Sequence, residues 1–321
     1  MPLVSRETIY PQPNDLNARD MNNMRIGRAE LVTSGRLLKV TQIPEVQEDY
    51  VDIDDPEAVI FALRGLRPRP DIFCFWQRLP ETQPKYPYYM EWDNVAAIPV
   101  RTFDQWLNKS IHSSVRKKLR KSKKIGVVVN VANFDDKLIQ GIAEIFNETP
   151  IRQGQPYPHY GKTCAEIRSE WSIDLDMSAF IGAYFEDELI GFVKLTFTER
   201  YAELYGTISM LKHRDKSPMS AMIAKAVEFC EAKRIPYLTY GKFTYGRKGE
   251  DSLSDFKRYN GFEKVQLPRY YVPLTFKGRI GLKLGLFHEL SYHLPPSLME
   301  RLRKLRTAYY VNRLGKDGLE K

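Results

Sequence analysis

The sequence predicts a mixed α/β fold of the α+β kind, in which strand-like and helix-like segments alternate along 321 residues. Two segments carry most of this prediction. Residues 179–211, AFIGAYFEDELIGFVKLTFTERYAELYGTISML, hold three apolar runs separated by polar turns, the pattern of consecutive antiparallel strands. Residues 213–229, HRDKSPMSAMIAKAVEF, then change from a charged loop into a helix with one apolar face.

The composition is that of a folded, basic protein. Hydrophobic residues make up 43% of the chain and aromatic residues 12%, which is enough for a packed core and argues against disorder. The length allows one large domain or two moderate ones. The formal net charge of +9 favours polyanionic partners such as nucleotides, nucleic acid or anionic lipid surfaces.

The cysteines and the N-terminus indicate the compartment. Cys74, Cys164 and Cys230 are far apart and lack paired metal-ligand spacing, so we expect reduced thiols and no metal site. The first residues lack the apolar core of a signal peptide, and no apolar run approaches the ~18 residues that span a membrane. We therefore expect a cytoplasmic protein without a transmembrane segment.

The first third of the chain reads as short strands around one helix. Asp55 and Pro56 are a helix-start signal, whereas the three prolines and crowded aromatic residues of 80–94 indicate a loop. We expect strands over 36–45, 71–79 and 95–100, and a helix over 55–66.

A basic helix is predicted over residues 111–126, after a short helix that Thr102 caps. Only Val115, Leu119 and Ile125 are apolar, so the helix has a thin apolar seam. A helix of this kind either faces solvent or binds a polyanion, and both readings remain open. Its seven cations are Arg116, Lys117, Lys118, Arg120, Lys121, Lys123 and Lys124.

From residue 127 the pattern becomes regular. Asn260 and Gly261 form a helix-stop signal, and the polar turn at 186–188 joins two apolar runs. We expect strands over 127–134, three within 179–211, one over 235–243 and one over 263–274; helices over 135–149, 164–175, 218–233 and 252–262; a loop over 150–162; and two basic helical segments in 275–321.

The junction between the charged loop and the helix of 213–229 has the chemistry of an anion site. Ser217 can cap the helix, and Pro218 suits the first helical position. The unpaired N–H groups of a helix start carry partial positive charge, to which His213, Arg214 and Lys216 add. Such a junction suits a phosphate or pyrophosphate, although an ordinary capped helix beside a solvated loop remains an alternative.

Two other segments have groups that could bind a ligand. The stretch 241–252 contains glycines and the cations Lys242, Arg247 and Lys248, but it lacks the spacing of a nucleotide-binding P-loop. The loop QPYPHYGK places His159 among aromatic residues. A flexible surface loop and a structural histidine are the respective alternatives.

The order of these elements resembles the GNAT acyltransferase fold, and four stretches resemble the FemAB-like branch of that superfamily. They are HSSVRKKLRKSKKIGVVV, FNETPIRQGQPYPHYGK, AFIGAYFEDELIGFVKL, and AKAVEFCEAKRIPYLTYGKFTYG with SLSDFKRYNGFEKV. The junction HRDKSPMSA lacks the glycines of the usual [QR]-x-x-G-x-[GA] motif. The resemblance covers about residues 95–275, and it rests on the order and spacing of all four stretches.

The resemblance implies a mixed, mainly antiparallel twisted sheet flanked by helices. We expect an N-terminal region over 1–94 that is at most a reduced GNAT-like half, an acyltransferase domain over 95–275, and a basic helical tail over 276–321.

The resemblance also implies an N-acyltransferase. We expect transfer of an acyl group from acyl-CoA, as co-substrate and without a metal, to an amine of a small molecule or of a lipid-linked cell-envelope or polysaccharide precursor. One alternative is an amide ligase that uses aminoacyl-tRNA. Another is a non-catalytic module that binds a polyanion or lies peripherally on an anionic membrane through its basic tail.

Acyl transfer to an amine assigns roles to the candidate residues. The donor needs a grip on its phosphates, the amine needs a base, and the leaving group needs a proton. We expect Arg214, Lys216, Ser217 and Ser220 to bind the donor; Glu148 and His159 to act as base; Tyr240 or Tyr245 to supply the proton; and Arg152, Tyr160, Lys194 and Lys242 to bind substrate.

Overall fold

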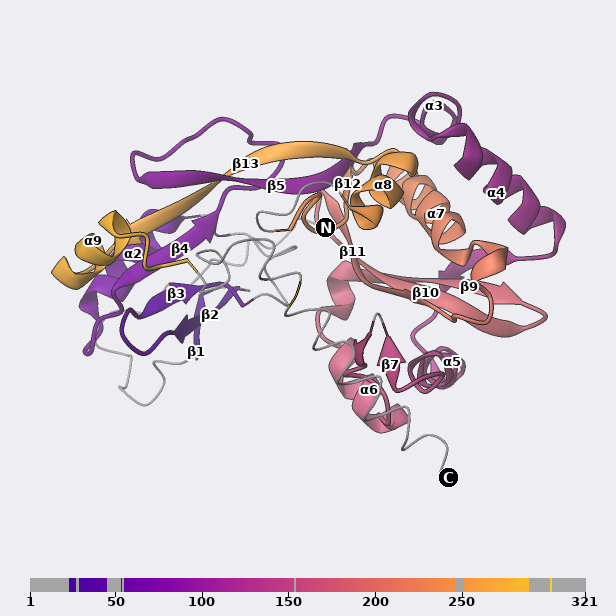
Figure 1. The fold of residues 1–321 in the computed structure, drawn as a ribbon, viewed down its shortest axis with the longest axis horizontal. Helices are drawn as coiled ribbons and strands as arrows, with labels where there is room; N and C mark the ends of the chain where they lie inside the picture. The colour runs from indigo at the N-terminus through magenta and orange to yellow at the C-terminus, as the bar shows by residue number, and fades with distance from the viewer. Residues whose placement is uncertain are drawn as a thin grey trace, which may run out of the picture. The chain divides into compact units, whose positions relative to one another are not determined.

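The computed structural model of the chain describes residues 23–26, 29–44, 53, 55–152, 154–245, 251–288 and 301. These residues fall into two compact units (Figure 1). Unit 1 takes its described residues from 23–95 and 265–288, and unit 2 takes its own mainly from 96–264.

Unit 1 is a sheet with two helices. Its strands lie in the order β1-β2-β3-β4-β13. The pair β3–β4 is parallel, whereas β1–β2, β2–β3 and β4–β13 are antiparallel. The elements are β1 (Asn23–Ile26), β2 (Ala29–Ser34), β3 (Val40–Gln42), α2 (Pro56–Gly65), β4 (Ile72–Trp76), β5 (Tyr89–Pro99), which ends in unit 2, β13 (Glu263–Pro273), which begins there, and α9 (Phe276–Lys283).

In unit 1, the predicted helix start at Asp55 and Pro56 is confirmed, and the predicted end of one loop is wrong. The Asp55 carboxylate accepts a hydrogen bond from the Ala58 N–H at 3.0 Å, and Pro56 takes the first helical position, as predicted. The loop predicted over 80–94 ends earlier, because β5 begins at Tyr89. The prolines of that stretch end at Pro87, and the aromatic residues after it favour a strand that continues into the predicted one.

Unit 2 contains the elements that the sequence predicts, with small differences at their ends. Thr102 and Asp135 cap their helices through side-chain oxygens, as expected of these residue types. The loop predicted over 150–162 contains a two-stranded hairpin. The remaining elements are α3 (Phe103–Gln105), η1 (Trp106–Ser110), α4 (Ser113–Lys124), β6 (Val128–Ala132), α5 (Asp136–Phe146), β7 (Ile151–Arg152), β8 (Gln155–Pro156), α6 (Cys164–Trp171), η2 (Leu175–Met177), β9 (Ser178–Phe185), β10 (Glu188–Phe197), β11 (Ala202–Ser209), η3 (Arg214–Lys216), α7 (Pro218–Lys233), β12 (Tyr237–Thr239) and α8 (Ser252–Tyr259).

The strands of unit 2 lie in the order β5-β12-β11-β10-β9-β6. Only β11 and β12 are parallel, because α7 crosses over between them, whereas consecutive strands joined by tight turns are antiparallel. The predicted mixed, mainly antiparallel sheet is therefore confirmed. The parallel pairing is short, and it joins Ala202 to Leu238 and Glu203 to Thr239.

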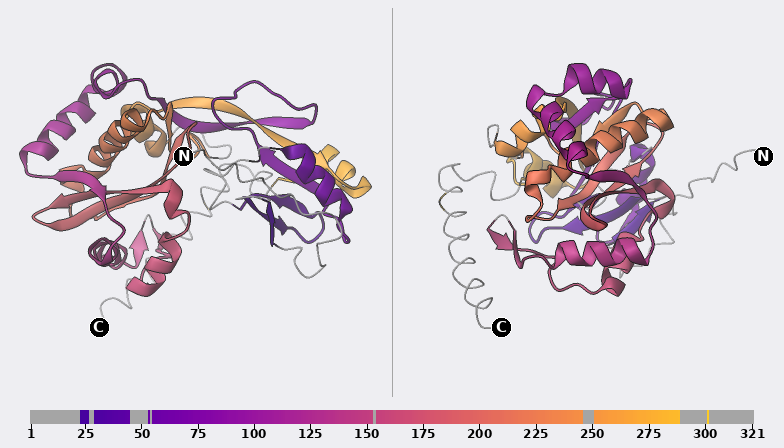
Figure 2. Two further views of the ribbon diagram at one scale, coloured as in Figure 1. Left: turned by 180° about the vertical axis from the view of Figure 1, so that it is seen from behind. Right: turned by 90° about the vertical axis from the view of Figure 1, so that its right-hand side faces the viewer.

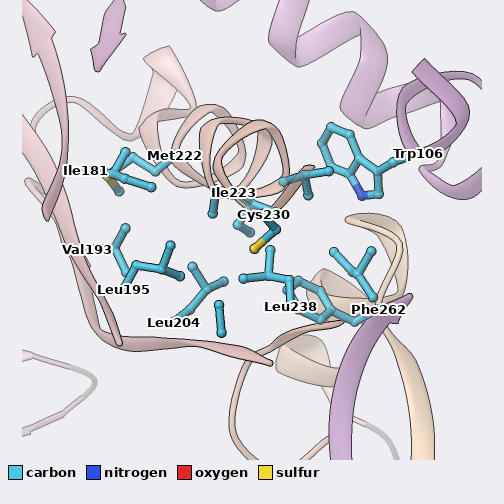
Figure 3. Close-up of a cluster of buried hydrophobic side chains, with 14 of the residues drawn as sticks. Trp106, Ile181, Val193, Leu195, Leu204, Met222, Ile223, Cys230, Leu238 and Phe262 are labelled. Carbon is cyan, nitrogen blue, oxygen red and sulfur yellow. The ribbon is translucent and has the colours of Figure 1, made fainter. Parts of the chain in front are cut away.

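Helices cover both faces of the unit 2 sheet (Figures 1 and 2). On one face α7 contributes Met222, Ile223 and Cys230 to a cluster that includes Val193 of β10 and Leu204 of β11 (Figure 3). On the other face the apolar side of α5 packs with α6 around Phe146 and Phe192. Because both faces are covered, β10 is buried along nearly all of its length.

The start of α7 departs from the predicted cap. Pro218 is the first helical residue, as expected, but Ser217 makes no side-chain capping bond. Its backbone lies in the left-handed region, at φ 56° and ψ 43°, which closes the preceding 3-10 turn: its N–H donates to the Arg214 carbonyl at 3.1 Å. The helix start therefore keeps free N–H groups that a serine cap would have used.

The described residues contain neither a membrane-spanning helix nor a cluster of metal-ligating side chains. No helix there is long and apolar enough to cross a membrane. The same residues contain no group of three or more His, Cys, Asp or Glu side chains that could hold a metal ion.

Candidate active site

A pocket of about 920 Å³ opens in unit 2 beyond the short parallel pairing of β11 and β12. Its walls come from the end of β11, the start of α7, the segment 155–159, and parts of α4, α6 and α8. Just over half of the lining residues are apolar or aromatic, and the others are polar or basic. This composition is typical of a small-molecule or cofactor site.

A β-bulge shapes the pocket wall. Phe192 pairs with Ile208 and Lys194 with Tyr205, so Gly206 and Thr207 of β11 lie opposite the single residue Val193. Gly206 has φ +59° and lies against the Trp171 indole, where an added Cβ would come within 2.2 Å of the ring carbon Cη2. Only glycine allows this close approach.

The start of α7 forms the electropositive side of the pocket. Arg214, Ser217, Pro218, Met219 and Ser220 all line it. Pro218 has no N–H, so the unpaired donors of the first turn belong to Met219 and Ser220. The cation Lys118 of α4 also lines the pocket, and none of the lining residues is acidic. The lining therefore favours an anionic ligand.

Glu148 and Arg152 hold the segment that leads to α7. The Glu148 carboxylate accepts hydrogen bonds from the Leu211 N–H at 2.7 Å, the Lys212 N–H at 2.9 Å and the Arg152 guanidinium at 2.9 Å. The guanidinium also donates to the Ser209 carbonyl at 2.9 Å. We call this arrangement the Glu148–Arg152 clamp, and it fixes 209–212 before Arg214.

His159 lines the pocket among aromatic side chains. Its ring stacks on Phe146, with the ring centroids 4.5 Å apart, and lies beside Tyr157 and Trp171. Burial lowers the His159 pKa below its usual 6.5, the Lys162 cation lowers it further, and Glu170 opposes both effects. Nδ1 lies 3.1 Å from the Lys162 amine, whereas Nε2 has no hydrogen-bond partner among the described residues.

The pKa of Tyr240 is shifted upward, whereas that of His159 is shifted downward. Burial raises the pKa of its phenol to about 12, and the Glu203 carboxylate adds to this effect. The phenol is therefore protonated at neutral pH and can donate a proton. The Lys257 amine lies 4.5 Å from the centre of its ring and donates to the Tyr240 carbonyl at 2.7 Å, which fixes this end of the pocket.

The structure brings together some of the predicted site residues and separates others. Arg152, His159, Arg214, Ser217, Ser220 and Tyr240 all line the pocket. Six residues are not part of its lining, namely Glu148, Tyr160, Lys194, Lys216, Lys242 and Tyr245. Tyr160 and Tyr245 are exposed, and Lys216 lies over the Phe185 ring at 4.7 Å and within 3.5 Å of Asp215.

Lys194 is buried and serves the backbone. Its amine donates to the carbonyls of Trp171 and Ile173, at the end of α6. Burial lowers the Lys194 pKa, and the nearby Asp174 partly opposes this effect. These contacts position the helix end that carries Trp171, so Lys194 lies behind the pocket wall.

Sequence reasoning missed several lining residues. Gly206 could have been found, because a glycine inside a strand pattern indicates a bulge or a close approach. Trp171 and Lys118 carried no comparable signal, since one lies in an amphipathic helix and the other is one of seven cations in 116–124. Tyr157 was seen only as a neighbour of His159.

No protein-family model matches the chain, and no curated protein matches it.

Solved structures are similar in fold. The C-terminal domain of a putative lysylphosphatidylglycerol synthetase from Agrobacterium fabrum has a TM-score of 0.51 at 12% identity, over 83% of this chain and 88% of that one. L-PGS from Bacillus licheniformis has a TM-score of 0.51 at 14% identity, over 76% and 81%. FemX has a TM-score of 0.49 at 12% identity, over 79% and 86%. The likeness to the two synthetase structures, together with the parallel pair β11 and β12 that α7 connects, supports the predicted fold, a mixed α/β sheet flanked by helices.

Proposed function

We propose that the chain is an acyltransferase that moves an acyl group from a phosphate-bearing donor, acyl-CoA, to an amine. One observation carries this proposal: a single pocket joins the start of α7 to a neutral histidine and a protonated tyrosine. Amide formation requires that the donor be bound, that the amine lose a proton and that the leaving group gain one. One cavity thus has a candidate group for each of these requirements.

The donor's phosphates are assigned to the start of α7. Arg214 is exposed at the mouth of the pocket, and the N–H groups of Met219 and Ser220 add the positive end of the helix. Ser217 and Ser220 supply hydroxyl groups. The Glu148–Arg152 clamp positions this segment.

The proposed reaction uses His159 and Tyr240 in the protonation states that they have at neutral pH. In the tautomer whose Nδ1–H faces the Glu170 carboxylate, 3.6 Å away, His159 accepts a proton at Nε2 from the acceptor amine, whose nitrogen attacks the acyl carbonyl carbon. As the C–N bond forms, the peptide N–H groups of the Gly206–Thr207 bulge stabilise the oxyanion. The C–S bond then breaks, and Tyr240 gives its proton to the leaving thiolate, so that an amide and the free thiol result.

The cations of α4 favour an alternative donor. Lys118 lines the pocket, and Lys117, Arg120, Lys121, Lys123 and Lys124 are exposed on the same helix without an ion-pair partner among the described residues. A row of free cations beside the pocket suits the phosphates of an RNA, and aminoacyl-tRNA is therefore the alternative donor.

The acceptor is an amine of a small molecule or of a lipid-linked envelope or polysaccharide precursor. One structural neighbour bears the name lysylphosphatidylglycerol synthetase, which denotes an aminoacylated lipid product and supports a lipid-linked acceptor. A cytoplasmic location, with peripheral contact to the membrane, belongs to the same proposal.

Thermal unfolding with candidate donors tests the proposal. We expect acetyl-CoA or a longer acyl-CoA to raise the Tm of the full chain, because a ligand that binds only the folded state stabilises it. The increase should disappear in Arg214→Gln and persist in Lys109→Gln, which removes an exposed cation of η1 outside the pocket lining.

The other outcomes separate the alternatives. Stabilisation by tRNA alone would replace the thioester donor with aminoacyl-tRNA. An equal effect of acyl-CoA on Arg214→Gln and the wild type would reject the donor site at α7. Stabilisation by neither class would leave the non-catalytic module as the better reading.

A further inference from the structure

Helix α9 of unit 1 turns its large apolar side chains outward. Phe276 is 76% exposed, Ile280 44% and Leu284, just after the helix, 63%. These residues are spaced at i, i+4 and i+8, so they form one stripe along the helix. Leu286 and the loop residue Leu37 are also exposed, by 57% and 84%. Exposed apolar residues gathered in this way mark an interaction site.

Glycines hold α9 in this orientation. Gly278 and Gly281 form its buried side, and an added Cβ would lie 2.0 Å from the Asp71 carbonyl oxygen at Gly278 and 2.7 Å from the Leu38 side chain at Gly281. The Thr275 hydroxyl caps the helix by accepting from the Gly278 N–H at 2.9 Å, and it donates to the Asp71 carboxylate at 2.7 Å. The helix therefore packs on unit 1 through its glycine side, and the apolar stripe faces outward.

Cations flank the stripe. At 100° per residue, Arg279 and Lys283 lie on one side of it and Lys277 on the other. Arg279 and Lys283 are exposed and have no ion pair among the described residues, and Lys277 reaches Asp71 at 3.4 Å while its side chain stays 59% exposed. The helix sequence FKGRIGLK contains no acidic residue.

We propose that this α9 face binds an anionic lipid membrane. An interfacial helix inserts its apolar stripe at the boundary between head groups and acyl chains while basic side chains meet the lipid phosphates, and α9 has both parts on one outward side. A nucleic acid would use the cations but leave the stripe in water. A symmetric second copy would bring Arg279 and Lys283 close to their own counterparts, which opposes self-association.

Co-sedimentation of the full chain with vesicles tests the proposal and does not depend on the proposed transferase activity. The probes are vesicles of phosphatidylcholine alone and vesicles with phosphatidylglycerol added, in about 0.15 M salt, where exposed charges farther apart than ~8 Å are screened. We expect binding to the phosphatidylglycerol vesicles at least tenfold stronger than binding to phosphatidylcholine.

Two variants separate the parts of the face. Ile280→Ser with Leu284→Ser should weaken binding to the anionic vesicles by at least tenfold, and Arg279→Gln with Lys283→Gln should remove the preference for anionic lipid. Val128→Ser with Val131→Ser is the matched control, because it removes two exposed apolar residues of β6 in unit 2. It should bind as the wild type does. Unchanged Tm values confirm that each variant is folded.

Three results would overturn the proposal. The wild type could show no preference for anionic vesicles. The serine variant of α9 could bind as tightly as the wild type, which would move the binding to other cations. The wild type could also form a dimer in solution that Ile280→Ser with Leu284→Ser dissociates, which would make the face a contact between copies of the chain.

Discussion

The pocket of unit 2 and the α9 face of unit 1 place side chains in opposite ways. In the pocket, titratable groups are partly removed from water: His159 and Tyr240 are half-buried, and burial changes the pKa of both. At the α9 face, apolar groups are held in water by a helix docked on its glycines. Each placement costs folding free energy, and in each the surrounding contacts fix it.

The contrast separates two kinds of function. Buried groups with changed proton affinity suit chemistry on a ligand inside the pocket, whereas an exposed apolar stripe with flanking cations suits attachment to a surface. If this separation is correct, a substitution in the pocket should not change membrane binding, and a substitution at the α9 face should not change the acyl-transfer rate.

The largest expected effect is on catalysis by His159. His159→Gln should lower the acyl-transfer rate by at least about 100-fold, because a positioned general base contributes 10²–10⁴-fold. Vesicle binding measured on the same preparation should not change. A variant that kept more than half of the wild-type rate would remove His159 from the mechanism.

Tyr240 should have a smaller effect of the same kind. Tyr240→Phe removes the phenol proton donor and keeps the ring, so we expect a rate loss of roughly 10–100-fold in steady-state kinetics. Because Lys257 contacts the ring and the backbone carbonyl, the Tm should stay close to that of the wild type. A parallel loss of Tm and rate would indicate a structural role for the phenol.

A glycine of α9 should control stability and not chemistry. Gly278→Ala places a Cβ against the Asp71 carbonyl oxygen, so the free energy of unfolding should fall by about 1–3 kcal/mol, as overpacking does. Urea denaturation measures this change. The control Lys283→Ala, at an exposed position of the same helix, should stay within about 0.5 kcal/mol. Equal stabilities would mean that α9 is not docked through Gly278.

The smallest expected effect is the pH dependence. Because the His159 pKa in the folded protein is below 6.5, the base stays neutral until the pH falls below that value, and kcat/KM should decrease only under more acidic conditions. Vesicle binding should stay constant between pH 6 and 8. A rate that declines already between pH 8 and 7 would contradict the neutral histidine.

Local pattern predicted most of unit 2. The amphipathic spacing of α5 and α7, the hairpin turn before β10 and the cap at Thr102 are interactions within a few residues, and they survive in the structure. The start of β5 was misplaced because a proline-rich stretch and a strand share one aromatic-rich segment.

The site was harder to predict, because its members meet only in the folded chain. Glu148 was predicted as a base and Arg152 as a substrate-binding residue, and both also hold backbone groups of 209–212, some sixty residues away. Lys194 looked like an anion ligand and instead meets the end of α6. A charged side chain can satisfy a backbone group as well as a substrate, and its residue type does not distinguish the two.

The bulge in β11 has a consequence for how this fold tolerates change. Tyr205 and Ile208 both pack toward α5 and α6, although an odd number of steps separates them, because the extra residue of the bulge turns the strand over. Removal of one residue at 206–207 would restore the regular alternation, keep Ile208 on the same side as Tyr205, and abolish the bulge that forms the pocket wall against Trp171. Homologues should therefore vary freely in the length of surface loops while keeping the spacing between Tyr205 and Pro218 constant.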